Sequence, residues 1–184
     1  MERINSVITD LSASSDPLSA DVYFIKGDTN CYVFDVGNCE KALQEIIAIS
    51  QEKVIILSHY HKDHTGNIDK VNYKELYVGD LTKETIQRGT VVTDEVVIHD
   101  GVELLIQHCP SPHVNGSLIV TVNKEYTLLA DLYFTRAGYD KELANEMLKV
   151  LGELETKYFV VSHQQGENIF EKKKIIKELK EYFK

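Results

Sequence analysis

The sequence lacks any apolar run close to the roughly 18 residues that a membrane-spanning helix needs. Its first residues, Met1–Asn5, also lack the charged-then-apolar order of a secretory signal. It contains no internal repeat, no low-complexity tract and no long linker rich in Pro, Gly or Ser. With 184 residues and 43% hydrophobic content, the chain is long enough to bury a sizeable core. We therefore expect a cytoplasmic protein, without a membrane partner, formed by a single domain over residues 1–184.

Cysteine is scarce, and its three positions are scattered: Cys31, Cys39 and Cys109. Their odd number and the lack of CxxC spacing favour buried or half-buried free thiols in a reducing compartment. Cys109 lies close in sequence to a candidate metal ligand, so a redox or metal-binding role for it stays open.

Positive charge is also scarce, because 20 Lys and Arg residues stand against 29 Asp and Glu residues, a formal net charge of −9. An acidic surface repels phosphate backbones, and only a local basic patch would overcome this repulsion. The obvious basic run, Lys172–Lys174, falls in a Lys/Glu-rich helical stretch typical of a solvated face. We therefore expect no nucleic-acid partner.

Short apolar runs alternate with longer amphipathic ones, which predicts a layered α/β or α+β architecture. Strands are predicted where Val, Ile and Tyr cluster between Gly, Asn, Asp or Lys: Asp21–Ile25, Cys31–Phe34, Val54–Leu57, Glu75–Val78, Glu95–Ile98, Glu103–Ile106, Ser117–Val122, Tyr126–Ala130 and Tyr158–Val161. Helices are predicted at Glu40–Ser50, Lys83–Gly89, Lys141–Glu155 and Phe170–Phe183.

The clearest chemical signal is the segment His59–His64, which reads HYHKDH and follows the apolar run Val54–Leu57. In extended backbone, His59 and His61 point the same way and can share one metal ion. Asp63 and His64 can serve a second ion if the chain turns, which the following Thr-Gly-Asn permits. Clustered imidazoles and a carboxylate are costly to bury without a cation, so the pattern predicts a metal site rather than a polar loop.

Four further residues follow strand-like runs: Asp35, His113, Asp131 and His163. Taken singly, an aspartate after a strand is more often a turn or cap residue. Side chains beyond the carboxyl ends of strands can, however, converge on one rim, where sites in layered α/β folds lie. His108 is a rival for His113, whereas His99 is expected to be a surface residue at a strand end.

The order Asp35-Val36-Gly37, His59–His64, His113 before Gly116-Ser117, Asp131 and His163 resembles the metallo-β-lactamase superfamily, from about residue 20 to 165. The resemblance implies an α/β fold, a four-layer αβ/βα sandwich with the site at one edge of two facing sheets. It implies one ion held by His59, His61 and His113, and another by Asp63, His64 and His163. Asp131 would bridge both ions and Asp35 would support the ligand loop. Two positions depart from the family pattern: Ser111-Pro112 replaces Pro-Gly before the third histidine, and Gln164 replaces the glycine after the last.

Two divalent ions about 3.5–4 Å apart can share a water and lower its pKa toward neutrality. The imidazole-rich ligand set favours zinc, with manganese or iron as alternatives. We expect a dinuclear hydrolase that uses a bridging hydroxide to cleave a small ester, thioester or lactone-like substrate, with Asp63 and Asp131 as catalytic carboxylates. A histidine at position 64 makes the motif resemble that of glyoxalase-II-like and lactonase-like members. True β-lactamases of the commonest class lack this histidine, so the resemblance disfavours antibiotic hydrolysis.

Other functions remain open on the same ligand set: iron-dependent redox chemistry or persulfide oxidation, phosphodiester hydrolysis, and a catalytically silent binding module. For the hydrolase we expect a small, anionic carbonyl compound as substrate, because the acidic surface disfavours long polyanions. Candidate substrate contacts are those close in sequence to the ligands: Tyr60, Asn67, Asn115, Tyr133 and Arg136.

Overall fold

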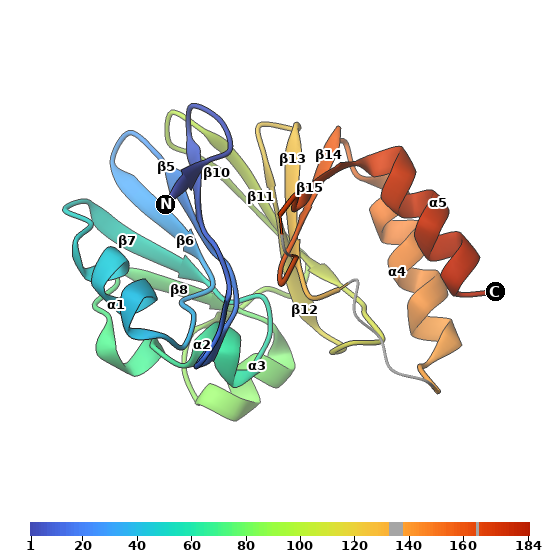
Figure 1. The fold of residues 1–184 in the computed structure, drawn as a ribbon, viewed down its shortest axis with the longest axis horizontal. Helices are drawn as coiled ribbons and strands as arrows, with labels where there is room; N and C mark the ends of the chain where they lie inside the picture. The colour runs from blue at the N-terminus through green and yellow to red at the C-terminus, as the bar shows by residue number, and fades with distance from the viewer. Residues whose placement is uncertain (133–137, 165) are drawn as a thin grey trace.

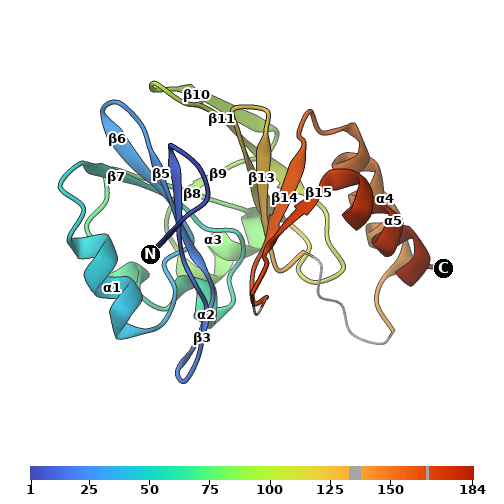
Figure 2. The same cartoon turned by 45° about the horizontal axis from the view of Figure 1, so that its top comes forward.

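The computed structural model describes residues 1–132, 138–164 and 166–184. Two β-sheets face each other and helices lie on their outer surfaces, which gives four layers in the order α, β, β, α (Figures 1 and 2). The layered α/β architecture predicted from the sequence is therefore present. Within the described ranges, no helix combines the length and the apolar character needed to cross a membrane.

The first sheet has seven strands in the order β1-β2-β5-β6-β7-β8-β9. Its strands pair antiparallel from β1 to β6 and parallel from β6 to β9. The strand bounds are β1 Glu2–Arg3, β2 Ile8–Leu11, β5 Val22–Lys26, β6 Asn30–Phe34, β7 Glu52–Ile56, β8 Glu75–Val78 and β9 Thr90–Val91. Between β2 and β5 the chain forms a separate hairpin of β3 (Ser14–Ser15) and β4 (Leu18–Ser19).

The second sheet has six strands in the order β10-β11-β12-β13-β14-β15. All neighbours pair antiparallel except β13 and β14, which run parallel. The bounds are β10 Glu95–His99, β11 Glu103–Cys109, β12 Ser117–Val122, β13 Tyr126–Ala130, β14 Tyr158–Val161 and β15 Ile169–Glu171.

The core follows from the alternation of side chains along the strands. In β5, Tyr23 belongs to the apolar layer between the sheets, whereas Phe24 packs in the outer layer that includes helix α1 (Glu40–Ile47). In β12, Val120 faces the inner layer, and Ile119 packs with α4 (Lys141–Glu153) and α5 (Lys172–Tyr182). Each sheet is therefore buried on both faces where helices cover it, which fixes the strand register.

All four predicted helices differ from their observed bounds. Helices α1 and α4 begin as predicted but end at Ile47 and Glu153, before the predicted Ser50 and Glu155. Helix α3 spans Asp80–Ile86, three residues before the predicted Lys83–Gly89. The acidic Asp80 suits the first helical turn, and Gln87 ends the helix in a left-handed conformation with φ 59°. The predicted helix Phe170–Phe183 begins too early, because Phe170 pairs with β14 as part of β15.

Several short elements were not predicted: strands β1, β2, β9 and β15, the β3–β4 hairpin, the one-turn helix α2 (Lys62–Thr65) and the 3-10 turn Ile68–Lys70. They are two to four residues long. Segments of that length are too short for an alternating or helical pattern to be visible in sequence.

Candidate metal centre

Seven side chains predicted as ligands meet at one rim of the sandwich. They form two groups, in each of which the potential ligand atoms all lie within 4.8 Å of one another: His59, His61 and His113 in the first, and Asp63, His64, Asp131 and His163 in the second. The rim is formed by the carboxyl ends of β7, β13 and β14 and by the connection from β11 to β12. The structure thus brings together every residue that the sequence pattern marked as a ligand.

In the first group, imidazole nitrogens face one another. The Nε2 of His59 and the Nε2 of His113 lie 3.0 Å and 3.2 Å from the Nδ1 of His61. The Oγ of Ser58 lies 2.9 Å from the Nδ1 of His59, which leaves Nε2 to the centre. Burial and the charge of His64 hold the pKa of His59 far below its usual range. The neutral imidazole that results is the form that binds a metal ion.

The second group depends on a turn after His61, which the sequence predicts if Asp63 and His64 are to serve a second ion. Helix α2 begins immediately after His61 and places Asp63 and His64 on one side of the centre. The Nε2 of His163 lies 3.0 Å from the Oδ2 of Asp63, and the Nε2 of His64 lies 3.6 Å from the same atom. With Asp131, four side chains therefore offer nitrogen or oxygen atoms as potential metal ligands in this part of the rim.

Asp131 lies between the two groups. Its Oδ2 is 3.3 Å from the Nε2 of His64, 3.6 Å from that of His163 and 3.8 Å from that of His113. Among the described residues, its Oδ1 and the Nε2 of His64 are buried without a hydrogen-bond partner. Buried polar atoms without partners are costly, and a coordinated cation would satisfy them. The side chains present therefore fit a metal-binding role.

The buried carboxylate of Asp35 stabilises the ligand loop by accepting hydrogen bonds from it. Its Oδ1 accepts a hydrogen bond from the backbone N–H of Ser58 (2.8 Å), and its Oδ2 accepts one from the Ser58 hydroxyl (2.8 Å). The same Oδ2 lies 2.7 Å from the Nδ1 of His64, so that ring nitrogen donates to it and Nε2 faces the centre. Burial alone would lower the pKa of His64, but Asp35 and Asp131 outweigh it and raise this pKa to about 10.

Asp21 stabilises the position of His163 in a similar way, a role that the sequence did not predict. The Oδ2 of Asp21 accepts hydrogen bonds from the backbone N–H of His163 and from the hydroxyl of Ser162, both at 2.8 Å. Asp21 opens a predicted strand, and nothing in its local sequence signals a contact with a residue 142 positions away. The sequence likewise assigns no role to Ser58, which directly precedes the motif His59–His64.

Three residues at the centre have left-handed backbone: Asp35 (φ 62°), Ala130 (φ 49°) and His163 (φ 58°). Such a conformation costs a non-glycine residue about 1–3 kcal/mol and persists only where the surroundings enforce it. Here it turns the chain sharply at three strand ends, and this orients Asp131 and His163 toward the rim.

The dipeptide Ser111-Pro112, which replaces the Pro-Gly of the family pattern before His113, has a structural role. Ser111 stands where the family pattern has proline, and its Oγ accepts a hydrogen bond from the backbone N–H of His113 at 3.0 Å. Gly116, at φ 82°, then returns the chain to β12. The loop therefore delivers His113 to the first group despite its unusual sequence.

The rival residues lie elsewhere. His99 is an exposed residue of β10 that lies 3.9 Å from Glu103, as expected, and His108 belongs to β11 outside both ligand groups. Cys109 is also outside them, and burial raises the pKa of its thiol to about 12, which leaves it unreactive.

Among the candidate substrate contacts, Asn67 is buried and its amide donates to the carbonyls of Val36 and Cys39, a structural role. Tyr133 and Arg136 lie outside the described residues.

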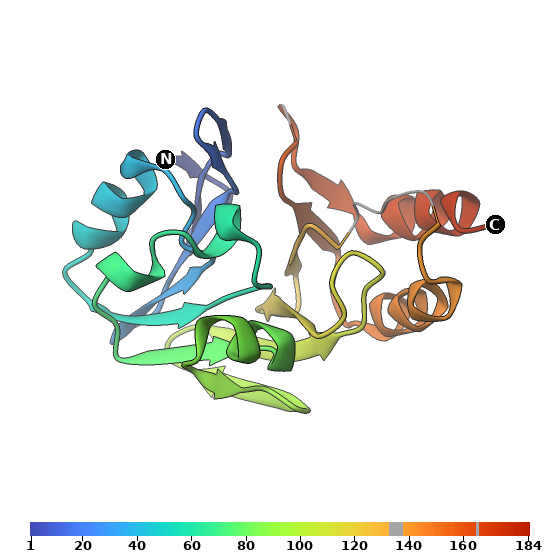
Figure 3. The same cartoon turned by 90° about the horizontal axis from the view of Figure 1, so that it is seen from below.

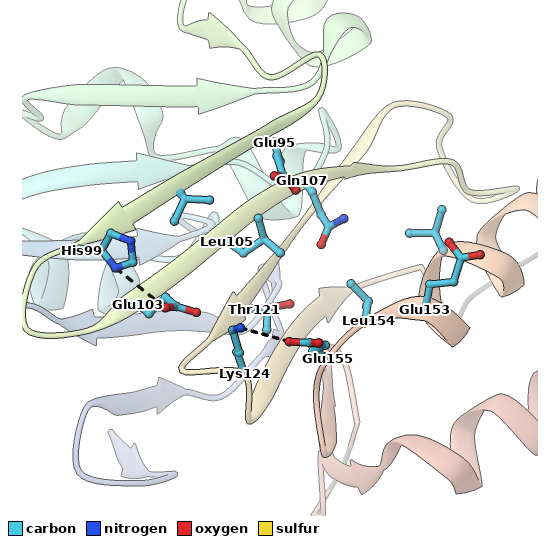
Figure 4. A pocket seen from close by; sticks show the side chains of 12 residues that line it. Glu95, His99, Glu103, Leu105, Gln107, Thr121, Lys124, Glu153, Leu154 and Glu155 are labelled. Carbon is cyan, nitrogen blue, oxygen red and sulfur yellow. Dashed lines mark ion pairs between the residues drawn. The ribbon is translucent and has the colours of Figure 1, made fainter.

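A separate cavity of about 510 Å³ lies against the outer face of β10, β11 and β12, beside the C-terminal end of α4 (Figure 4). Its lining includes Leu105, Gln107 and Leu154, with the ion pair of Lys124 and Glu155 at its border. None of the seven candidate ligands lines this cavity. It is therefore distinct from the metal centre.

The pKa of His64 predicts how the metal-free protein responds to pH. Because the folded pKa lies above the ordinary value of 6.5, protonated His64 stabilises the fold fully below pH 6.5, and this contribution is lost as the pH rises toward 10. We expect the free energy of unfolding to fall between pH 7 and 9 with a slope approaching about 1.4 kcal/mol per pH unit, the slope for one bound proton. Urea unfolding at several pH values measures this slope. Metal-loaded protein is the control and should lack it, since coordination replaces the proton; an equal slope in both forms would contradict the prediction.

Comparisons with known proteins agree with this fold. Residues 15–74, about a third of the chain, match the family model of the metallo-beta-lactamase superfamily. That segment includes Asp35 and the motif His59–His64. No curated protein matches the sequence.

Solved structures match over nearly the whole chain. A B3 metallo-beta-lactamase with an active-site glutamic acid superposes with a TM-score of 0.77 at 12% identity, covering 99% of this chain and 86% of that one. A flavoprotein from Thermotoga maritima gives a TM-score of 0.74 at 14% identity, covering 96% of this chain and 61% of that one. A metallo-beta-lactamase superfamily protein from Sulfolobus tokodaii gives 0.70 at 16% identity, covering 97% and 86%.

The resemblance to the metallo-β-lactamase superfamily is thereby confirmed, and the chain has the metallo-β-lactamase fold, an αβ/βα sandwich.

Proposed function

We propose that this protein is a dinuclear metal-dependent hydrolase that cleaves a small ester, thioester or lactone-like substrate. The observation that carries the proposal is the pair of ligand groups at one rim, with the Oδ2 of Asp131 within 3.8 Å of histidine nitrogens from both groups. His59, His61 and His113 would hold one ion, and Asp63, His64 and His163 the other, with Asp131 contacting both. Zinc suits this imidazole-rich set, while manganese and iron remain alternatives.

When bound, two divalent cations would lower the pKa of a water molecule toward neutrality and polarise the carbonyl oxygen of the substrate. The side chains of the protein would do the rest. Asp63 is partly exposed at the rim and would orient the attacking water by accepting its proton. Asp35 and Asp21 would hold His64 and His163 in place through the hydrogen bonds described above.

A second candidate is redox chemistry at a di-iron centre. The observation that favours it is the likeness to a flavo di-iron protein variant from Thermotoga maritima, with a TM-score of 0.72 at 13% identity, of which this chain covers 62%. Elemental analysis of protein purified without added metal separates the two, because hydrolysis with zinc and redox chemistry with iron need different ions. Two ions per chain are expected; a single tight site would contradict the dinuclear proposal.

The substrate class can be tested with protein reconstituted separately with zinc, manganese and iron. We expect turnover of small esters, thioesters or lactones to exceed turnover of phosphodiesters, RNA and single-stranded DNA, because the net charge of −9 disfavours polyanions. The His61→Ala protein should lose this activity, while the His99→Ala protein, altered at an exposed histidine, should retain it. Nucleic-acid cleavage that exceeds every small substrate and vanishes in His61→Ala would contradict the proposal.

A further inference from the structure

A cavity of about 480 Å³ begins at His163 and extends away from the metal centre. The β3–β4 hairpin lines one side of it, and Gln164, Gly166 and Asn168 line the other. Figure 3 shows the hairpin in blue and residues 166–168, just before β15, in red, projecting from the two sheets. Because His163 both lines this cavity and contacts Asp63, the cavity opens directly beside the candidate ligands.

The unusual residue of this cavity is Asp10 on β2. Its side chain is buried, with 4% of the residue exposed. The Oδ2 accepts a hydrogen bond from the Nδ2 of Asn168 at 3.0 Å, whereas Oδ1 is buried and has no partner among the described residues. Burial and the nearby charges of Asp21 and Glu2 raise the pKa of Asp10 to about 6, although the hydrogen bond from Asn168 and the charge of the N-terminal ammonium oppose the shift. At neutral pH the fold therefore buries a carboxylate that is only half satisfied.

The charge around Asp10 points to the kind of ligand. Glu2, Asp10 and Asp21 all line the cavity, and neither lysine nor arginine occurs among the described residues that line it. Ser12, Ser14 and Ser15 add hydroxyl groups along the hairpin side. The acidic residues do not make a further metal site, because the groups able to hold a metal ion, within the described part of the chain, are the two at the rim. The cavity is therefore suited to an organic cation with hydrogen-bond donors.

We propose that this cavity binds the part of the substrate remote from the bond that is cleaved, and that this part carries a primary ammonium group which pairs with Asp10. The proposal rests on the hydrolase function proposed above and narrows it to esters, thioesters or lactones that bear an amine. It also replaces the expectation of an anionic substrate, because an anion in this cavity would face three carboxylates. The ammonium group supplies both the positive charge and the donor that Oδ1 lacks.

The first test compares two series of substrates in the metal-loaded protein. In one series, esters carry a terminal ammonium group at increasing distance from the carbonyl. In the other series, the same esters have the amine acetylated. We expect the wild-type kcat/KM to favour the best ammonium ester by about 10-fold or more, mainly through KM, as for a charged hydrogen bond. In Asp10→Asn the ratio should fall to about one. The control Glu146→Gln, which removes one exposed carboxylate from α4, should keep the wild-type ratio. An Asp10→Asn protein that keeps the preference, or a wild type without one, overturns the proposal.

The second test needs neither metal nor catalysis. Butylammonium should raise the melting temperature of the metal-free wild-type protein more than butanol does, and this difference should disappear in Asp10→Asn. The Asp10→Asn protein should itself melt higher than wild type at pH 7 because it no longer buries a charge, whereas a purely structural Asp10 would make it melt lower. Butylammonium that stabilises no better than butanol overturns the inference. If butylammonium stabilises the wild type but no ester is hydrolysed with any metal, the proposed function fails and the cation site stands.

Discussion

The Asp131→Ala protein is expected to lose at least one metal ion and at least about 100-fold in hydrolytic activity while remaining folded. Asp131 Oδ2 lies within 3.8 Å of histidine nitrogens from both ligand groups. Without this carboxylate, the repulsion between two cations is less compensated, and both ligand sets are incomplete. Loss of a residue that only supports a metal ligand typically costs 10–100-fold, so loss of a shared ligand should reach at least the upper end of that range. Elemental analysis and kinetics on the same preparation measure both losses.

The matched control for Asp131→Ala is His99→Ala, which removes an exposed polar side chain from β10, outside both ligand groups. It should keep two metal ions and nearly wild-type activity. Circular dichroism of both variants establishes that the fold is retained. If the two proteins bind the same amount of metal, the assignment of Asp131 as a shared ligand is wrong.

The positions of several candidate ligands followed from the sequence because they lie at or just beyond the end of a strand that its own composition predicts. Val54–Leu57 predicts a buried strand, and His59–His64 must then lie at its carboxyl end. The same reasoning applies to Asp131 after Tyr126–Ala130 and to His163 after Tyr158–Val161. Strand ends in a layered fold lie at a shared rim, so a local pattern sufficed to place residues that are distant in the chain.

The supporting contacts could not be predicted in this way. Asp21 holds His163 across 142 positions, and its role depends on how the two sheets face each other. The acidic cavity depends on β2 and the β3–β4 hairpin, whose residues show no periodicity over so short a length. Asp10 would be expected to be exposed by residue type alone, since aspartate is rarely buried without a partner. Its burial, which suggests the cation pocket, is visible only in three dimensions.

Replacing Asp35 is expected to weaken both the fold and the metal centre. The carboxylate is buried and accepts hydrogen bonds from the backbone and hydroxyl of Ser58, and its Oδ2 also lies 2.7 Å from the Nδ1 of His64. In Asp35→Ala these donors lose their acceptor, and each buried unsatisfied group costs about 1–3 kcal/mol. Alanine also tolerates φ 62° less well than aspartate, whose short polar side chain can hydrogen-bond locally in this conformation, so the backbone adds to the loss. We therefore expect the free energy of unfolding to fall by about 3 kcal/mol or more, measured by urea denaturation of the metal-free protein.

The Asp35→Asn variant separates the backbone effect from the loss of the carboxylate. Asparagine tolerates the left-handed conformation and keeps one acceptor oxygen, so this protein should be more stable than Asp35→Ala. It carries no negative charge, however, and so holds the Nδ1 proton of His64 less strongly, which leaves Nε2 a weaker metal ligand. Metal titration should therefore show an affinity about 10–100-fold below wild type even in the better-folded variant. An Asp35→Asn protein with wild-type metal affinity would mean that packing around His64, rather than the Asp35 carboxylate, orients this ligand.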